Sequence, residues 1–318
     1  MNHRQPPTGT TKRAKYKIAL PVLSGLAAFS LCQQPAHAEE SGNTQWPSGL
    51  ETVASALLPP VGATEYYNYL FFYDVNRLSN NEGGKAVPNF SAKVVAEGAR
   101  LVHTWTSLGH GWELASQASM VLNYVHVNAT FGSGNAAGIN YIYMSPAYFA
   151  YNNASWHVLL GPSVIIPVGS FSTQKLVNPS NGYYSFNQEI DVTYMPSPVL
   201  EASIATSTTV NATNPVSHYH SGAIFDTDFD VNYSFIKSIP NLQFGINGFY
   251  TQQFTDDTVD SQPVDGNGFR LKKFAIGPQI VYYISPSIGV ALKWQHEIVS
   301  HNAPKGDGVW FEFVLPVG

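Results

Sequence analysis

The sequence predicts an all-β protein, a transmembrane antiparallel up-and-down β-barrel of about twelve strands with short periplasmic turns and long extracellular loops. Three observations lead to this prediction. Apolar and polar residues alternate with period two in many segments, the connections between these segments are alternately long and short, and Asp, Glu, Lys and Arg make up only 12% of the 318 residues. Soluble proteins contain about 25% charged residues, whereas each strand of a membrane barrel directs one face to lipid, where charge is unfavourable.

Residues 1–38 are expected to be a secretory signal peptide that exports the chain through the inner membrane toward the bacterial outer membrane. Five basic residues and no acidic residue occur in this stretch, residues 18–31 are mainly apolar, and Ala36-His37-Ala38 suits cleavage before Glu39. A membrane anchor is the alternative, but the apolar run is shorter than the ~20 residues that a span needs. Cleavage removes five of 16 basic and none of 21 acidic residues, so the formal charge changes from −5 to −10. Cys32, the single cysteine, leaves with the signal, which excludes disulfides.

Residues 39–64 show no alternation. Leu50, Val53, Ala54 and Leu57 have the spacing of a short amphipathic helix, and Pro59-Pro60 would end it. We expect this segment to be a periplasmic N-terminal tail or a small plug inside the barrel. The barrel itself is then expected to comprise residues 65–318.

The period-two alternation is clearest in residues 225–235, where Phe225, Phe229 and Phe235 share one face and acidic residues occupy the other. This is the pattern of a strand with two different faces. About twelve such segments follow one another, and many exceed the ~9–11 residues that a tilted membrane strand needs. They start near Tyr66, Lys93, Trp112, Ile139, Ser155, Tyr184, Val199, Gly222, Asn241, Phe269, Ser287 and Gly308.

The predicted connections alternate in length, as they do in outer-membrane barrels. The long ones are expected at residues 75–92, 127–138, 169–183, 211–221, 255–268 and 300–307, and the short ones at 107–111, 152–154, 196–198, 237–240 and 285–286. A soluble β-sandwich is the alternative, but it gives no reason for a strict alternation. Aromatic residues near strand ends are expected to form interfacial girdles, among them Tyr66, Tyr67, Tyr69, Phe71, Phe72, Tyr73, Tyr282 and Tyr283.

Charged residues on the polar faces are candidates for the lining of a pore. The acidic ones lie on three consecutive predicted strands: Glu189, Asp191, Glu201, Asp226, Asp228 and Asp230. Basic residues from later strands are expected to face them: Arg270, Lys272 or Lys273, and Lys293. Opposed charges would orient a dipolar solute and set charge selectivity. The alternative is a network of ion pairs that fills a closed interior, as in small barrels.

Several short motifs follow one another in an order typical of a known family. They are Leu57-Leu58-Pro59-Pro60-Val61-Gly62 before an aromatic strand, Gly161-Pro162-Ser163-Val164-Ile165-Ile166-Pro167-Val168-Gly169, Tyr219-His220-Ser221-Gly222, and Gly248-Phe249-Tyr250-Thr251-Gln252-Gln253-Phe254-Thr255-Asp256-Asp257. With them the chain resembles the outer-membrane proteins named for the meta-pathway of phenol degradation. The resemblance covers nearly the whole chain after the signal peptide. It implies a barrel that passes hydrophobic or aromatic growth substrates.

Gln253, Asp256 and Asp257 belong to the last of these motifs, and the resemblance makes them candidate loop or lumen residues. Asp256, Asp257 and Asp260 could bind Ca²⁺, but solvated acidic residues are commoner in loops, so no metal and no cofactor is expected. The histidines His103, His126 and His157 raise the alternative of a lipid hydrolase, but no nucleophile stands out by its spacing. We therefore do not expect this protein to be an enzyme.

The function expected from these observations is a channel for the uptake of small hydrophobic or aromatic compounds by facilitated diffusion. Its partners would be outer-membrane lipid and the solute. A nucleic-acid partner is excluded because the isoelectric point is near 6.0 and no basic stripe occurs. The oligomeric state stays open. The alternative to a channel is a closed structural or surface-binding barrel without transport.

Overall fold

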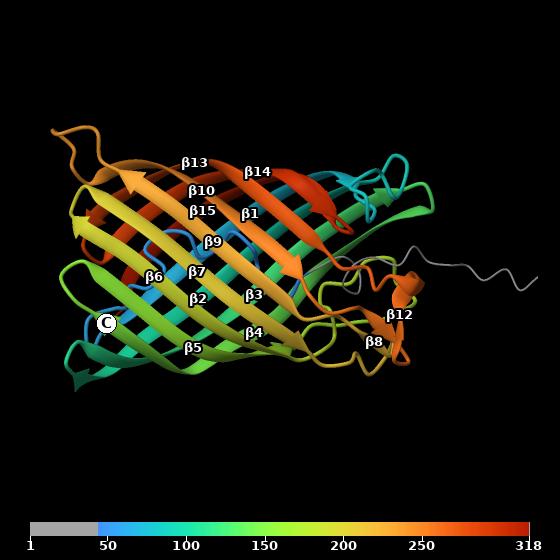
Figure 1. The fold of residues 1–318 in the computed structure, drawn as a ribbon, viewed down its shortest axis with the longest axis horizontal. Coiled ribbons are helices and arrows are strands. Elements are labelled where there is room, and N and C mark those ends of the chain that lie inside the picture. Colours follow the sequence, from blue (N-terminus) through green and yellow to red (C-terminus); the bar gives the residue numbers. More distant parts are fainter. Residues whose placement is uncertain (1–43, 318) are drawn as a thin grey trace, which may run out of the picture. The chain divides into compact units, whose positions relative to one another are not determined.

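The computed structural model describes residues 44–317, and within them twelve strands form one closed antiparallel barrel (Figure 1). The expected signal peptide lies outside the described residues. Each strand pairs with its neighbours in the chain, and β1 also pairs with β15, which closes the barrel. The strands are β1 (Thr64–Leu78), β2 (Ser91–Gly109), β3 (Trp112–Ala129), β4 (Gly132–Asn152), β5 (Trp156–Pro167), β6 (Ser185–Ser197), β7 (Leu200–Asn211), β9 (Ile224–Tyr233), β10 (Leu242–Gln253), β13 (Lys272–Ser285), β14 (Ile288–His301) and β15 (Pro304–Val317).

The predicted fold class is thereby confirmed. Closure gives every strand of the barrel a hydrogen-bonded neighbour on both sides, as a membrane requires. Within residues 44–317 no helix is long and apolar enough to cross a membrane.

The two ends of the barrel differ. At one end, which we call the turn end, β1 begins, β15 ends, and the connections are residues 110–111, 153–155, 198–199, 234–241 and 286–287. The other end, which we call the loop end, carries residues 79–90, 168–184, 212–223 and 254–271. Three short strands in these loops, β8 (Tyr219–His220), β11 (Thr258–Val259) and β12 (Gln262–Pro263), form a small separate sheet, followed by the 3₁₀ turn η2 (Val264–Gly266) (Figure 1).

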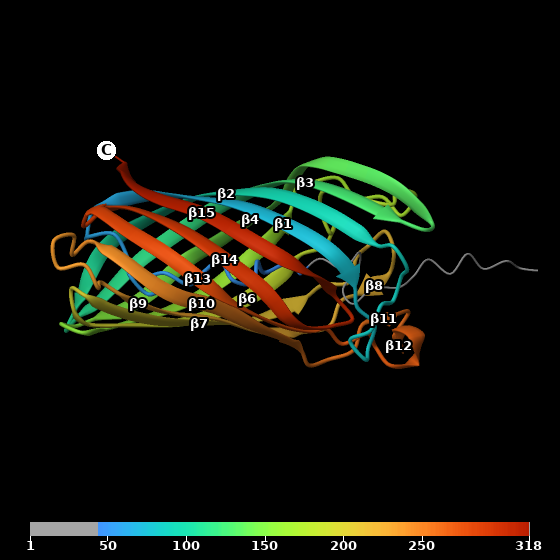
Figure 2. The same cartoon turned by 90° about the horizontal axis from the view of Figure 1, so that it is seen from above.

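Two of the connections predicted to be long are tight turns. Only residues 130–131 lie between β3 and β4, and only residues 302–303 lie between β14 and β15. Residues 132–138 contain three glycines, a composition that predicts a loop. They nevertheless pair with β3, with Ala129 opposite Gly132 and Asn123 opposite Gly138. The β3–β4 hairpin extends at the loop end (Figure 2). Small residues suit this part of β4 because a loop lies against it: a Cβ at Gly134 would lie 3.4 Å from Val177 Cγ2, and one at Gly138 would lie 3.4 Å from Pro179 Cβ.

The outer surface of the barrel is apolar, as the alternation predicts. Large apolar side chains on successive outward positions are substantially exposed, for example Ile190, Ile204, Val231, Ile246, Ile280, Leu292 and Phe311. The inward positions between them are buried and polar, for example Asp191, Ser203, Asp230, Asn247, Gln279, Lys293 and Glu312.

A lysine in the outward set is expected to destabilise the barrel strongly. Ile246 lies near the middle of β10 and is 56% exposed, so in Ile246→Lys the ammonium group faces hydrocarbon, at a cost of about 2–4 kcal/mol. Chemical unfolding from lipid vesicles measures the loss. Ile239→Lys in the turn before β10 is the control, and it should change the free energy of unfolding by less than about 0.5 kcal/mol. Equal losses for the two variants would contradict the assignment of this surface to lipid.

Candidate functional site

The inward faces of β6, β7 and β9 carry a continuous acidic wall. It consists of the six predicted residues Glu189, Asp191, Glu201, Asp226, Asp228 and Asp230, each at most 2% exposed. The register places these strands side by side, with Asp230 opposite Ser203 and Asp191 opposite Ala205. All six side chains lie on the lumen side of neighbouring strands.

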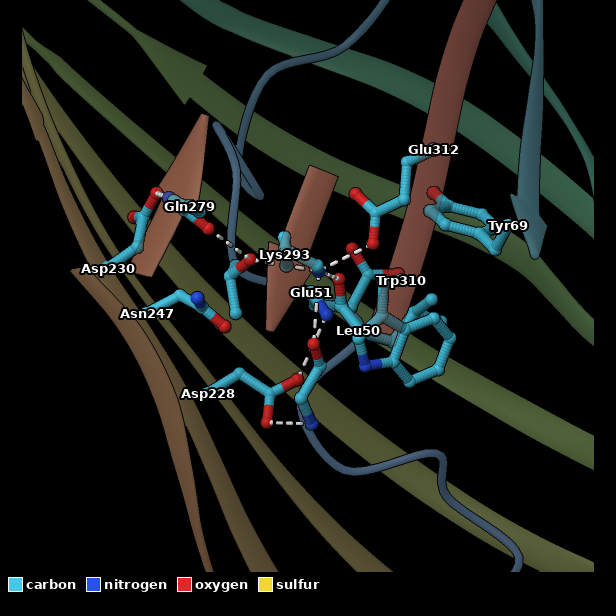
Figure 3. Close-up of polar contacts among 12 residues, drawn as sticks. Leu50, Glu51, Tyr69, Asp228, Asp230, Asn247, Gln279, Lys293, Trp310 and Glu312 are labelled. Atoms are coloured by element: carbon cyan, nitrogen blue, oxygen red, sulfur yellow. Dashed lines mark hydrogen bonds and ion pairs between the residues drawn. The ribbon is translucent and has the colours of Figure 1, made fainter. Parts of the chain in front are cut away.

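The acidic wall is covered by the chain's own residues 44–63, which we call the lumen segment. The Gly49 N–H donates to Asp228 Oδ1 over 2.6 Å, and the Glu51 N–H donates to Asp228 Oδ2 over 2.9 Å (Figure 3). Further toward the turn end, the Ala54 N–H donates to Glu201 Oε1 over 3.1 Å. Backbone donors of the lumen segment therefore bind carboxylates that are candidates for a pore lining, and the interior here is filled by the chain itself.

On the opposite side of the lumen segment, Lys293 of β14 binds its carbonyl groups. The Lys293 Nζ donates to Gly49 O over 3.0 Å and to Leu50 O over 2.9 Å, and it forms an ion pair with Glu312 over 2.5 Å (Figure 3). Gly49 has φ of +86°, and a Cβ there would lie 2.3 Å from Gln295 Oε1. Glycine is therefore needed for both the backbone conformation and the close approach to β14.

The expected helix around Leu50 and Leu57 does not form, because residues 44–63 contain turns and bends only. Backbone groups of this stretch bind the barrel wall instead. The Ala56 N–H, for example, donates to Thr193 Oγ1 over 3.1 Å. Side chains on opposite walls satisfy donors and acceptors that a helix would satisfy internally.

A cavity of about 270 Å³ remains between the lumen segment and the wall formed by β1–β4, β14 and β15. The inward residues of β2 along this cavity are small and apolar, namely Ala92, Val94, Ala96 and Gly98. They leave space that larger side chains would fill. The cavity reaches from loop-end residues such as Phe90 and Leu176 to the level of Arg100.

Eight aromatic side chains also line the cavity: Trp46, Tyr69, Phe71, Tyr73, Tyr141, Tyr143, Phe249 and Trp310. Phe71 of β1 stacks on Trp310 of β15, with ring centroids 4.0 Å apart and 21° between the planes. Trp46 of the lumen segment contacts Tyr143 edge to face at 5.6 Å. The lining offers both ring faces and ring edges, which suit another aromatic ring.

A small polar group occupies one side of the cavity near the loop end. Lys273 forms an ion pair with Glu297 over 2.5 Å, and the Tyr73 hydroxyl donates to Glu297 Oε2 over 2.7 Å. The Lys273 ammonium also lies 5.2 Å from the centre of the Tyr73 ring. A solute in the cavity therefore meets a few placed polar groups within an apolar surface, the usual composition of a small-molecule site.

The aromatic residues of β1 were assigned to an interfacial girdle, and for several of them this is wrong. Tyr69, Phe71 and Tyr73 line the cavity, and Tyr67 shares their face of the strand. Leu70 and Phe72 on the other face are apolar too, so the alternation of polarity cannot tell which face of β1 points inward. The signal that was available is the regular spacing of four aromatics at alternate positions.

Arg270 does not lie where it was predicted. It precedes β13, its side chain is 51% exposed, and it forms an ion pair with Asp256 over 2.7 Å at the loop end. Lys273 and Lys293 do face the lumen, and they are joined there by Arg100 of β2, which the sequence did not single out. Each of these three cations forms an ion pair with an acidic side chain in the lumen.

The motif residues Gln253 and Asp257 are fully buried at the loop end. The Gln253 Nε2 donates to Asp257 Oδ1 over 2.7 Å, and Asp257 also accepts from the Tyr219 hydroxyl over 2.6 Å and from the Gly222 N–H over 2.7 Å. These bonds join the end of β10 to the loops before β9 and β13. Among the described residues no group of three His, Cys, Asp or Glu is arranged to hold a metal ion.

Weakening this junction should loosen the loop end. In Asp257→Asn the side chain keeps one acceptor oxygen and loses its charge, and we expect a loss of about 1–3 kcal/mol in the local stability of the loops. Limited proteolysis of the folded barrel at residues 254–271 should become faster. The control is Asp260→Asn in the same loop, where Asp260 is exposed. Equal cleavage rates for both variants and the unchanged protein would contradict a structural role of Asp257.

The fold and the cavity define the class of the protein: it is a closed membrane-type barrel with a mainly apolar site in its lumen. A family model described as "Putative MetA-pathway of phenol degradation" matches residues 75–313. The chain belongs to this family, as the motifs indicated. The comparison with curated proteins found no match.

Solved structures confirm the architecture. An outer membrane channel from Pseudomonas putida F1 is similar with a TM-score of 0.73 at 14% sequence identity, over 83% of this chain and 98% of that chain. The beta domain of the Bordetella autotransporter BrkA is less similar, with a TM-score of 0.47 at 11% sequence identity over 80% of this chain and 98% of that chain. A structure described as the CymD monoaromatic hydrocarbon channel has a TM-score of 0.45 at 7% identity over 88% of this chain and 97% of that chain. The first of these comparisons shows that this barrel shares its fold with an outer membrane channel of known structure.

Proposed function

We propose that this protein is an outer-membrane channel that takes up small hydrophobic or aromatic compounds by facilitated diffusion. The observation that carries the proposal is the aromatic-lined cavity of about 270 Å³ inside a lumen whose other wall is strongly polar. An apolar cavity of about 150 Å³ is large enough to bind benzene. The cavity therefore has room for one aromatic ring with a small substituent.

The polar groups beside the cavity suggest how such a solute is oriented. Lys273, Glu297 and the Tyr73 hydroxyl lie near the loop end, whereas the deeper lining by Tyr69, Phe71 and the small residues of β2 is mainly apolar. A phenol-like solute can place its ring on Phe71 and its hydroxyl toward Lys273 and Glu297. Passage needs no energy source in this scheme, since a concentration gradient is sufficient.

The location follows from the outer surface. Its exposed apolar side chains suit contact with lipid, and the family and the channel fold support insertion into the bacterial outer membrane after export by the signal peptide. The loop end then faces outward and the turn end faces the periplasm, as in other outer-membrane barrels.

Uptake is tested in vesicles that carry lipopolysaccharide in the outer leaflet and contain the purified protein. Phenol and toluene are expected to enter with a saturable rate well above that of empty vesicles, and glucose is the polar control solute. Binding is measured independently, since Trp46 and Trp310 line the cavity and their fluorescence should change when toluene binds. Entry at the rate of empty vesicles, together with unchanged fluorescence, would overturn the proposal.

A closed barrel without transport is the second candidate, and the lumen segment is the observation that favours it. In that case the vesicle experiment shows no entry, and shortening the loop at residues 168–184 impairs binding to a surface partner instead. The structures compared above are described as channels and as the beta domain of an autotransporter, and none of these descriptions names an enzyme. The histidines give no sign of a triad, since His103 Nδ1 lies 2.9 Å from Thr64 Oγ1 and His157 Nδ1 lies 2.7 Å from Asn152 Oδ1.

A further inference from the structure

The cavity ends at a barrier formed by the lumen segment. Arg100 of β2 forms an ion pair with Glu51 of the segment, Nη1 to Oε1 over 2.6 Å, and donates to the Tyr69 hydroxyl over 3.2 Å. Both charged side chains are about one-tenth exposed. The pair spans the lumen between the segment and β2 and closes the cavity toward the turn end.

Between this ion pair and the turn end, buried side chains fill the lumen. Ala56 of the lumen segment packs with Ala115, Tyr148 and Leu159 of the wall, and all four are fully buried. Val102 on the inward face of β2 is 1% exposed. Separating Arg100 from Glu51 alone therefore opens no path, because the segment itself occupies the space below.

The lumen segment is held by bonds that can be released together. Between residues 48 and 56 its backbone bonds to side chains of the wall, among them Asp228, Lys293 and Thr193, and forms no strand ladder with the wall in the described structure. The fit is also incomplete, since Arg100 Nε and Ser55 Oγ are buried without a hydrogen-bond partner. Native interiors leave few such groups, and these two lie where the segment meets the wall.

One end of the lumen segment is tethered to β2, mainly through backbone groups of β2. At the turn end Thr104 of β2 binds it three times, through Oγ1 to Pro59 O over 2.8 Å, through its carbonyl to the Gly62 N–H over 2.8 Å, and through its N–H to Ala63 O over 3.2 Å. Gly62 has φ of +83° and no atom within 4 Å of its Cβ position, so glycine permits the backbone conformation that these bonds require. At the other end Gln45 Nε2 donates to Tyr183 O near the loop end.

From this geometry we propose that the lumen segment is a tethered gate. Residues 44–58 leave the acidic wall as one unit while residues 59–63 stay bound to Thr104, and the Arg100–Glu51 ion pair is the latch between the gate and β2. A solute in the cavity passes to the periplasm only while the gate is displaced. The role of the gate rests on the proposed uptake function. The experiments distinguish a failure of the gate from a failure of uptake.

A disulfide can lock the gate. Ser48 Oγ of the segment lies 2.8 Å from Thr251 Oγ1 of β10, which is close enough for a disulfide in Ser48→Cys/Thr251→Cys. No cysteine follows Cys32 in the chain, so the introduced pair has no competitor after signal cleavage. We expect toluene and phenol entry into vesicles to fall at least tenfold when this variant is oxidised and to recover on reduction. The matched control is Asn187→Cys/Thr209→Cys, a pair within the wall on β6 and β7 with 2.8 Å between Thr209 Oγ1 and Asn187 Oδ1, whose oxidation should leave entry unchanged.

A second measurement follows the gate without transport. Ser55 is 7% exposed and its hydroxyl makes no hydrogen bond, so Ser55→Cys disturbs little. A water-soluble maleimide should label Cys at this position in the folded barrel, and at least tenfold more slowly when the 48–251 disulfide is also present. Heat-dependent gel mobility confirms that each variant is folded.

The outcomes separate the two proposals. Entry that is equal in the oxidised and reduced lock variant overturns the gate and leaves the uptake function standing. Absence of entry in every form overturns the uptake function, and labelling at position 55 then decides whether the segment moves. A Cys at position 55 that stays unlabelled in the folded, unlocked barrel overturns the gate.

Discussion

Lys293→Met is expected to destabilise the barrel by about 3–5 kcal/mol, the loss typical of a buried ion pair with one partner removed. Lys293 is fully buried, and its ammonium group binds Glu312 and two carbonyl groups of the lumen segment. The variant leaves Glu312 as a buried charge without its cation and leaves the carbonyl groups of Gly49 and Leu50 without this donor. Chemical unfolding from lipid vesicles, followed by tryptophan fluorescence, measures the loss.

The control for this prediction is Lys237→Met. Lys237 lies exposed in the turn between β9 and β10, so removing its charge should change the free energy of unfolding by less than about 0.5 kcal/mol. If both variants unfold at the same denaturant concentration, the ion pair between Lys293 and Glu312 does not contribute as the structure indicates.

Filling the cavity is expected to abolish solute binding while the barrel stays folded. Ala96 lies on the inward face of β2, opposite Phe71 of β1 and Asn123 of β3, and lines the cavity. In Ala96→Trp the indole occupies the space where a solute ring would lie, so we expect affinity for toluene and phenol to fall at least about a hundredfold, equivalent to about 2.7 kcal/mol. Isothermal titration with toluene measures the affinity.

The control is Val95→Trp, one position along the same strand. Val95 is 37% exposed on the outer face, where a tryptophan contacts lipid and leaves the cavity unchanged. Unaltered toluene affinity in Ala96→Trp would show that the solute binds elsewhere. Unfolding of Ala96→Trp at the same denaturant concentration as the unchanged protein would show that the lost affinity does not come from a damaged barrel.

The barrel was predictable because the residue alternation within each strand indicates its two faces. A strand such as β9 alternates between apolar residues and Asp226, Asp228 and Asp230, and this pattern alone assigns the two faces. Residues that depart from the pattern were assigned less well. The glycines of β4 read as a loop although they pair with β3, and β1 is apolar on both faces, so its cavity-lining aromatics were placed at the membrane interface.

The site was only half predictable for a related reason. The sequence shows that carboxylates face the lumen, but not what they bind there. Asp228 binds the N–H groups of Gly49 and Glu51, which lie more than 170 residues earlier in the chain. No local pattern records such a contact, because a backbone N–H is the same in every residue except proline. A segment without alternation could equally be a tail outside the barrel.

The position of the lumen segment has a consequence for assembly. The segment runs from the loop end, where Gln45 bonds to Tyr183, to the turn end, where it continues into β1 at Thr64. A closed, fully hydrogen-bonded wall has no side entrance. The segment must therefore lie in place when β1 pairs with β15, or be threaded lengthwise through the finished barrel. In the first case the last seam to form also encloses Asp228 and Lys293 with their partners, so closure of the wall and neutralisation of its interior become a single folding step.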